Sequence, residues 1–136
     1  MNFTRTAAAL ATAASIAAFA QPASAQALPR FCANNVLVTN SFYSNVLSNG
    51  ATSEVEYHGQ FQNQDPNRRT MTATMSIVVA RFGQWEITRP LARFSLGAYQ
   101  QSDVVLMALR KRNPGGEGAP TPAQVGTQIR FTCSFV

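Results

Sequence analysis

Apolar and polar residues alternate with a period of two along most of the chain, a pattern typical of half-buried β-strands. The alternation is clearest at 54–61, 70–77 and 129–135. In the last of these segments it places Cys133 on the apolar face. We therefore expect strands, each with one face toward a core, to dominate the fold.

Further strands are predicted at 85–88 and 94–98, and the Arg89–Pro90 step between them predicts an extended or edge segment. A continuous apolar run favours a strand at 102–112, with one short helix as the alternative. Three prolines and three glycines make residues 113–122 a loop before the last strand.

The segments 54–61 and 70–77 are separated by turn residues at 63–69, which predicts a β-hairpin. If apolar residues face one another, Met71 and Met75 lie opposite aromatic rings, so we interpret both as core residues rather than copper ligands. The same register places His58 opposite Thr74 and Glu56 opposite Ser76. Its apolar pairs are Phe61 with Met71, Gly59 with Ala73, Tyr57 with Met75, and Val55 with Ile77.

Six to eight short strands in about 110 residues predict an all-β domain. We expect an antiparallel β-sandwich of immunoglobulin-like or related topology, with a small β-barrel as the alternative. A true immunoglobulin domain is disfavoured, because Cys32, Trp85 and Cys133 are too far apart in sequence for the usual arrangement of a tryptophan beside the disulfide.

The first 25 residues have the pattern of a secretory signal peptide. A mildly basic start precedes an apolar stretch at 7–20, and Ala23–Ser24–Ala25 forms a small-residue cleavage site before Gln26. The apolar stretch has 14 residues, fewer than the roughly 20 that a membrane span needs. We expect cleavage to leave one domain, 26–136, in the periplasm or the medium of a bacterium.

The cysteines of this domain are Cys32 and Cys133, and an even count in an exported protein predicts one disulfide. Cys32 shares its parity with Val36 and Val38, so the bridge can lie in the core between the first and last strands. In the chain-entropy model, closing a loop of about 100 residues stabilises a fold by up to about 4.7 kcal/mol.

The chain is 46% hydrophobic and 12% charged, which excludes intrinsic disorder. Residues 26–136 carry ten basic and six acidic side chains, a net charge of +4. Basic clusters at Arg110–Lys111–Arg112 and Arg68–Arg69, with the loop at 113–122, are candidate surfaces for an anionic or protein partner. The alternative is a role in solubility and edge protection. Nucleic acid is not expected, because no aromatic stripe is interleaved with the basic residues.

Glu54, Glu56 and His58 share one strand face at intervals of about 6.5 to 7 Å. They form a candidate weak polar site, for a metal or for acid–base chemistry. Zinc sites draw three or four ligands from more than one element, and His58 is the only histidine. A solvated strand face is the simpler interpretation, and no metal or cofactor is expected.

The sequence thus predicts a small exported β-sandwich domain, monomeric and non-catalytic, that binds an envelope protein or an anionic envelope component. One alternative is a structural or accessory subunit that pairs through a strand edge. Another is a metal-dependent or acid–base hydrolase that uses Glu54, Glu56 and His58.

Overall fold

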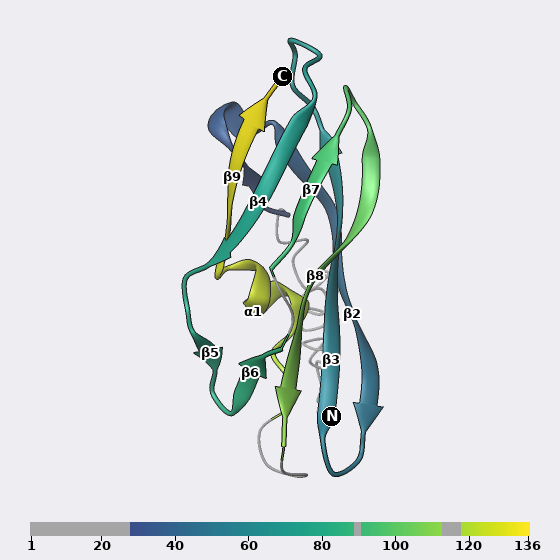
Figure 1. The fold of residues 1–136 in the computed structure, drawn as a ribbon, viewed down its shortest axis with the longest axis vertical. Coiled ribbons are helices and arrows are strands. Elements are labelled where there is room, and N and C mark those ends of the chain that lie inside the picture. The colour runs from purple at the N-terminus through teal and green to yellow at the C-terminus, as the bar shows by residue number, and fades with distance from the viewer. Residues whose placement is uncertain (1–27, 89–90, 113–117) are drawn as a thin grey trace, which may run out of the picture.

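The computed structural model describes residues 28–88, 91–112 and 118–136, which form two antiparallel sheets (Figure 1). The predicted signal peptide, the Arg89–Pro90 step and positions 113–117 of the predicted loop lie outside the described residues. No helix in the described ranges is both long and apolar enough to cross a membrane. The elements are β1 (Arg30–Phe31), the 3-10 helix η2 (Ala33–Asn35), β2 (Leu37–Asn49), β3 (Ser53–Asn63), β4 (Met71–Ile77), β5 (Arg81–Phe82), β6 (Trp85–Ile87), β7 (Arg93–Leu96), β8 (Gln101–Lys111), α1 (Pro122–Gly126) and β9 (Ile129–Phe135).

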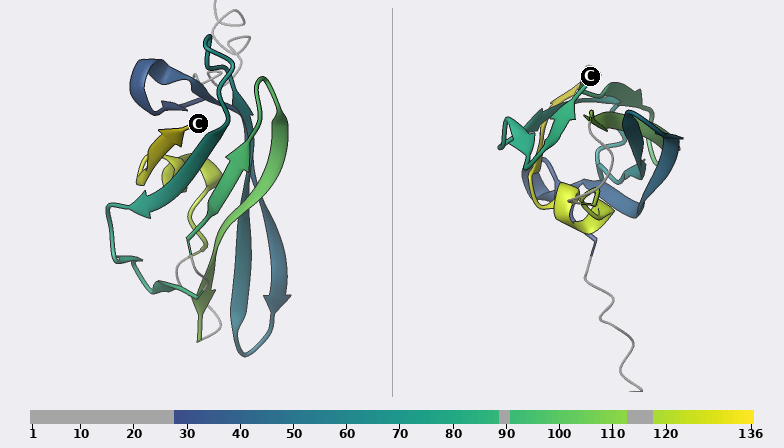
Figure 2. Two further views of the ribbon diagram at one scale, coloured as in Figure 1. Left: turned by 45° about the horizontal axis from the view of Figure 1, so that its top comes forward. Right: turned by 90° about the horizontal axis from the view of Figure 1, so that it is seen from below.

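One sheet has the order β1-β2-β3-β8-β6-β5 and the other β7-β4-β9. The larger sheet curls into a half-barrel, so that the two sheets surround one core (Figure 2). The Ala92 N–H, just before β7, donates to the Leu106 carbonyl on β8 and links the sheets. On the other side α1 packs against β2. The predicted all-β class with antiparallel sheets is confirmed.

The predicted hairpin between β3 and β4 is wrong. β3 lies between β2 and β8, and β4 lies between β7 and β9, so none of the four predicted apolar pairs forms. His58 is not opposite Thr74, nor Glu56 opposite Ser76. Alternation identifies the buried face of a strand but not the neighbouring strand. Residues 64–70 carry the chain from one sheet to the other, and the two apolar faces share the core instead of lying side by side.

The buried faces themselves are as predicted. Met71 and Met75 lie in the core, as do Tyr57 and Phe61. An aromatic cluster fills the space between the sheets, with ring centroids 4.9 to 6.4 Å apart. Its rings belong to Phe31, Phe61, Phe94 and Phe131.

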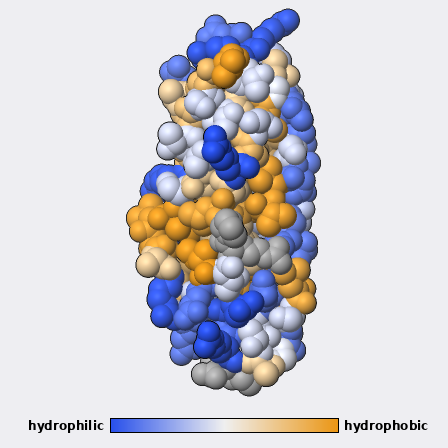
Figure 3. All heavy atoms as spheres, in the orientation of Figure 1, coloured by the Kyte–Doolittle hydropathy of each residue, from blue (hydrophilic) through white to orange (hydrophobic). Residues whose placement is uncertain are grey.

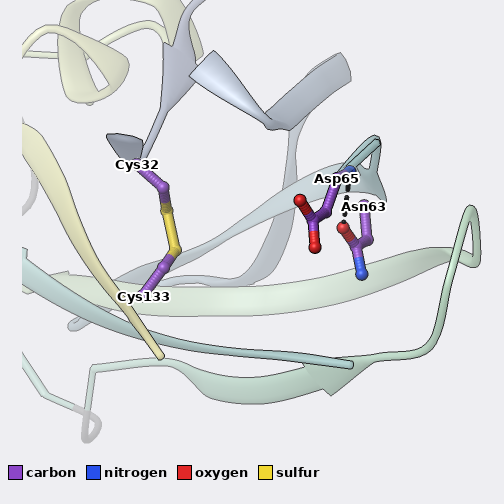
Figure 4. Close-up of a disulfide and its surroundings, with 4 residues drawn as sticks. All are labelled: Cys32, Asn63, Asp65 and Cys133. Atoms are coloured by element: carbon purple, nitrogen blue, oxygen red, sulfur yellow. Dashed lines mark hydrogen bonds between the residues drawn. A yellow bond between two sulfur atoms is a disulfide. The ribbon is translucent and has the colours of Figure 1, made fainter. Parts of the chain in front are cut away.

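The predicted disulfide between Cys32 and Cys133 is present, with Cα atoms 5.7 Å apart (Figure 4). Cys133 lies on β9 opposite Ala73 of β4, and Cys32 directly follows β1. Cys32, Asn34 and Asn35 all have positive φ, so the chain turns sharply between β1 and β2. Asparagine tolerates this conformation better than most residues.

Residues 101–111 form the long strand β8, so the predicted strand at 102–112 is confirmed. The sequence prediction did not include α1. Thr121 and Gln124 form a capping box at its start, and Pro122 occupies the first turn. Thr-x-x-Gln with proline after the cap is a helix-start signal, so the sequence did contain a marker for this element.

Candidate functional site

The basic triplet at the end of β8 does not form one exposed surface. Arg110 is exposed, and its guanidinium lies 3.5 Å from the Glu54 carboxylate on β3. Lys111 is only 5% exposed, and its Nζ lies 6.0 Å from the centroid of the Trp85 ring. Arg112 is exposed again. Successive side chains of a strand point to opposite faces, so the middle residue of the triplet is separated from its neighbours.

The second basic pair lies in the connection between β3 and β4, where Arg69 has a structural partner. Its Nε donates to Oδ2 of the buried Asp65 at 2.8 Å, and its guanidinium lies 4.4 Å from the centroid of the Phe135 ring. The hydrogen bond from the Arg69 side chain holds the pKa of Asp65 below its usual range, and the same bond raises the pKa of Arg69. Arg68 is exposed. Arg68 can therefore contact a ligand without breaking a structural contact, whereas Arg69 would have to leave Asp65.

The two basic clusters lie at opposite ends of the molecule. Lys111 is the partner of Ser53 at the start of β3, and Arg68 follows Asn63 at the end of β3. Eleven residues of extended strand span about 35 Å. One compact ligand cannot contact both clusters.

The predicted polar site lies on the outer face of the six-stranded sheet. His58 Nε2 lies 2.6 Å from Glu56 Oε1, and His58 Nδ1 lies 3.4 Å from Asp103 Oδ1 on β8. The Tyr43 ring, from β2, stacks on the imidazole at 4.7 Å, and its hydroxyl donates to Asp103. That hydrogen bond is the main reason why the pKa of Tyr43 is raised. Glu54, farther along the same face, lies 3.5 Å from the guanidinium of Arg110.

Four acidic side chains share this outer face, which we call the carboxylate face: Glu54, Glu56, Glu86 and Asp103. The described residues contain no group of three or more His, Cys, Asp or Glu side chains in a metal-binding arrangement. The hydrogen-bonded chain on this face could relay a proton, but neither cavity described below is lined by it. Catalysis by Glu54, Glu56 and His58 stays a prediction.

The outer face of the three-stranded sheet is chemically different. Thr72 of β4 lies between Ser95 of β7 and Ser134 of β9. One row along, Thr74 lies between Arg93 and Thr132. Figure 3 shows the region over β4, β7 and β9 as mostly pale spheres with isolated hydrophilic ones. We call this surface the hydroxyl–arginine face; it consists of Thr72, Thr74, Ser76, Arg93, Ser95, Arg130, Thr132 and Ser134.

No acidic residue that the structure describes lies on the hydroxyl–arginine face. Of the five acidic residues that the structure describes, four form the carboxylate face and Asp65 is buried beside Arg69. Among the described residues, no ion pair joins Arg93 or Arg130 to a carboxylate. Arg130 instead donates to the carbonyls of Thr127 and Ile129. Sequence reasoning missed both arginines, because they are isolated in the chain and meet only through strand pairing.

Two cavities flank α1. The larger, of about 780 Å³, is an open groove between the β5 segment and α1, lined by Arg81, Phe82, Pro120 and Gln124 among others. The smaller, of about 250 Å³, is mostly apolar and is lined by Leu28, Pro29 and Phe42 together with α1. The larger cavity reaches the edges of both outer faces: Arg81 pairs with Glu86 of the carboxylate face, and the carbonyl of Thr127 accepts from Arg130 of the hydroxyl–arginine face.

Comparisons of the chain with protein-family models, with curated proteins and with solved structures found no match. A proposal for its function therefore rests on the chemistry of its own surfaces.

Proposed function

We propose that the protein is a non-catalytic binding domain whose hydroxyl–arginine face binds an anionic polysaccharide outside the cytoplasm. The observation that carries the proposal is the composition of that face: six hydroxyl side chains, two guanidinium groups and no carboxylate, on three adjacent strands. The disulfide supports an oxidising compartment, which agrees with the export signal predicted at the start of the chain.

The spacing of these groups suits an extended polymer. Neighbouring strands lie about 4.8 Å apart and alternate residues of one strand about 7 Å apart, so the hydroxyls form a regular flat array. Arg93 and Arg130 lie on either side of β4, one row apart, which places their Cα atoms at about 12 Å. Guanidinium groups bind carboxylate, sulfate and phosphate in a bidentate geometry, and hydroxyls donate to and accept from sugar hydroxyls.

The carboxylate face explains why binding would be one-sided. A polyanion is repelled by the carboxylates of Glu54, Glu56, Glu86 and Asp103. Arg110 lies 3.5 Å from Glu54 and Arg81 lies 3.6 Å from Glu86. The two faces belong to different sheets, so the repulsive groups lie away from the attractive ones. This asymmetry favours one bound orientation of the domain on a polymer.

The test measures binding of the oxidised, exported chain to dextran sulfate and polygalacturonate, with neutral dextran as the control polymer. The double variant Arg93→Ser/Arg130→Ser is compared with Arg68→Ser/Arg112→Ser, which removes the same charge from two exposed positions elsewhere. Hydrogen bonds to charged groups contribute about 1.5 to 3 kcal/mol each, so we expect the first variant to bind at least about tenfold more weakly.

The matched variant should bind like the wild type, and added salt should weaken binding to both anionic polymers. Equal losses in the two variants would show that only net charge matters and would overturn the assignment to this face. Wild-type protein that binds the anionic polymers no better than neutral dextran would overturn the proposed function itself.

A further inference from the structure

Strand β2 has a long free edge. On one side it pairs with β3 over nearly its whole length. On the other side β1 pairs only with Leu37 and Val38, and no described strand pairs with the rest. Six consecutive residues at its far end, 44–49, are exposed. This edge presents a row of backbone groups with no protein partner among the described residues.

The edge has bulges between Thr39 and Ser41 and between Val46 and Ser48, but it lacks charged side chains, the other usual protection. β2 contains no charged residue in 13 positions. The strands at the ends of the two sheets all carry arginine: Arg30 on β1, Arg81 on β5, Arg93 on β7 and Arg130 on β9. Soluble proteins commonly place charges on exposed edges to prevent pairing with another chain. β2 instead presents Val46, which is 68% exposed, and Leu47, which a bulge turns out of the ladder.

We propose that two copies of the chain associate edge to edge through β2 and so join their six-stranded sheets. An uncharged edge gives a charged peptide no ion pair beyond the backbone hydrogen bonds, whereas two identical uncharged edges form the same backbone hydrogen bonds and meet without like-charge repulsion. Antiparallel pairing of identical strands has two-fold symmetry, the commonest symmetry of homodimers. This arrangement departs from the monomer expected from the sequence and does not depend on the proposed function.

The position of the two-fold axis follows from exposure along β2. The exposed stretch is 44–49. Within it Val46 is the most exposed large apolar residue, at 68%, so we place the axis there. Val46 lies on the same side of the sheet as its buried partner Val55. In the dimer each exposed valine packs against its own copy, which removes apolar surface from water.

The first test is sedimentation equilibrium of the oxidised protein from about 10 µM to about 1 mM, the range of weak association. We expect a concentration-dependent dimer. Val46→Lys should weaken the dimer at least tenfold, because it places two positive charges at the axis. Val78→Lys is the matched control: Val78 is 62% exposed, close to the 68% of Val46, but lies in the connection between β4 and β5.

The second test is cross-linking. Both native cysteines are in the disulfide, so Val46→Cys adds a single free thiol. Residues directly opposite in an antiparallel pair have Cα atoms about 4.5 to 5.5 Å apart, within reach of a disulfide. Mild oxidation should give a covalent dimer from Val46→Cys and little from Ser95→Cys. A wild-type protein that stays monomeric to about 1 mM, or a dimer that Val46→Lys leaves intact, would overturn the proposal. Neither readout involves a polysaccharide, so the result is independent of the proposed function.

Discussion

The two ends of the molecule are stabilised very differently. The closed end contains the Cys32–Cys133 disulfide, Asn63 and Asp65 (Figure 4). Arg69, which pairs with Asp65, lies there too. The Asn63 side chain is fully buried, and the two hydrogens of its amide are shared among three backbone carbonyls within 3.1 Å of Nδ2. At the open end the β2–β3 hairpin extends beyond the core, and residues 44–49 are all exposed. The fold is therefore fixed at one end, and the other end is free to make contacts without loss of stability.

The largest effect should come from the disulfide at the closed end. Cys32→Ala together with Cys133→Ala should lower the free energy of unfolding by about 2 to 5 kcal/mol, because a bond across 101 residues no longer restricts the unfolded chain. Urea unfolding without reductant measures the difference. A loss below about 1 kcal/mol would show that noncovalent packing alone fixes the closed end.

Asn63→Ala should have the next largest effect and should lower the free energy of unfolding by about 2 to 4 kcal/mol. The substitution leaves the carbonyls of Arg69, Leu96 and Gly97 without their donor, and unsatisfied buried polar groups cost about 1 to 3 kcal/mol each. Asn45→Ala, at an exposed position of the open end, is the matched control and should stay within about 0.5 kcal/mol of the wild type. Similar losses at both positions would remove the contrast between the two ends.

Asp65→Asn should lower the free energy of unfolding by less than Asn63→Ala does, and the size of this decrease should depend on pH. The amide can still accept hydrogen bonds from the backbone, and the lost partner Arg69 is half exposed, where solvent screens the ion pair. Because the folded pKa of Asp65 lies below its unfolded value, its contribution is present above about pH 4 and is lost as the pH falls through the folded pKa. Urea unfolding at several pH values should show the difference between wild type and variant shrinking in acid. A difference that does not change with pH would contradict the ion pair.

Tyr57→Phe should have the smallest effect on stability, about 0.5 to 1.5 kcal/mol, the usual contribution of one hydrogen bond. The Tyr57 hydroxyl donates to the Pro120 carbonyl at 2.7 Å and ties the segment before α1 to β3. Burial raises the pKa of Tyr57 to about 12, so absorbance titration of the wild type should show a tyrosine step near pH 12 that the variant lacks. The burial of Tyr57 favours its neutral form, so this contribution to stability is present below about pH 10 and is lost as the pH rises through 12. A variant that keeps the step near pH 12 would assign it to another tyrosine.

The buried face of each strand could be predicted from sequence, because alternation depends only on neighbouring residues. The inward position of Cys133 and the burial of Met71 and Met75 follow from that pattern. The opposite orientation of Lys111 relative to Arg110 was also available from the same period of two, although the triplet was interpreted as one cluster. Strand neighbours could not be predicted, because they depend on how the connections cross the core.

The residues that make up the two candidate surfaces come together only through the strand neighbours that the sequence could not predict. His58 meets Asp103 and the Tyr43 ring only because β2 and β8 lie on either side of β3. Arg93 and Arg130 share a face only because β4 separates their strands. Both the carboxylate face and the hydroxyl–arginine face bring together residues that are far apart in the chain. No local pattern in the sequence indicates that such residues lie close together.

The position of the disulfide has a mechanical consequence. Cys32 and Cys133 lie close to the two ends of the described chain, at residue 28 and at Val136. A pulling force applied between those ends passes directly through the sulfur–sulfur bond, so the strands between the two cysteines carry almost no load. The oxidised domain should behave under tension as a short, inextensible link. After reduction the same force reaches the sheets, and about 100 residues can extend at roughly 3.5 Å each.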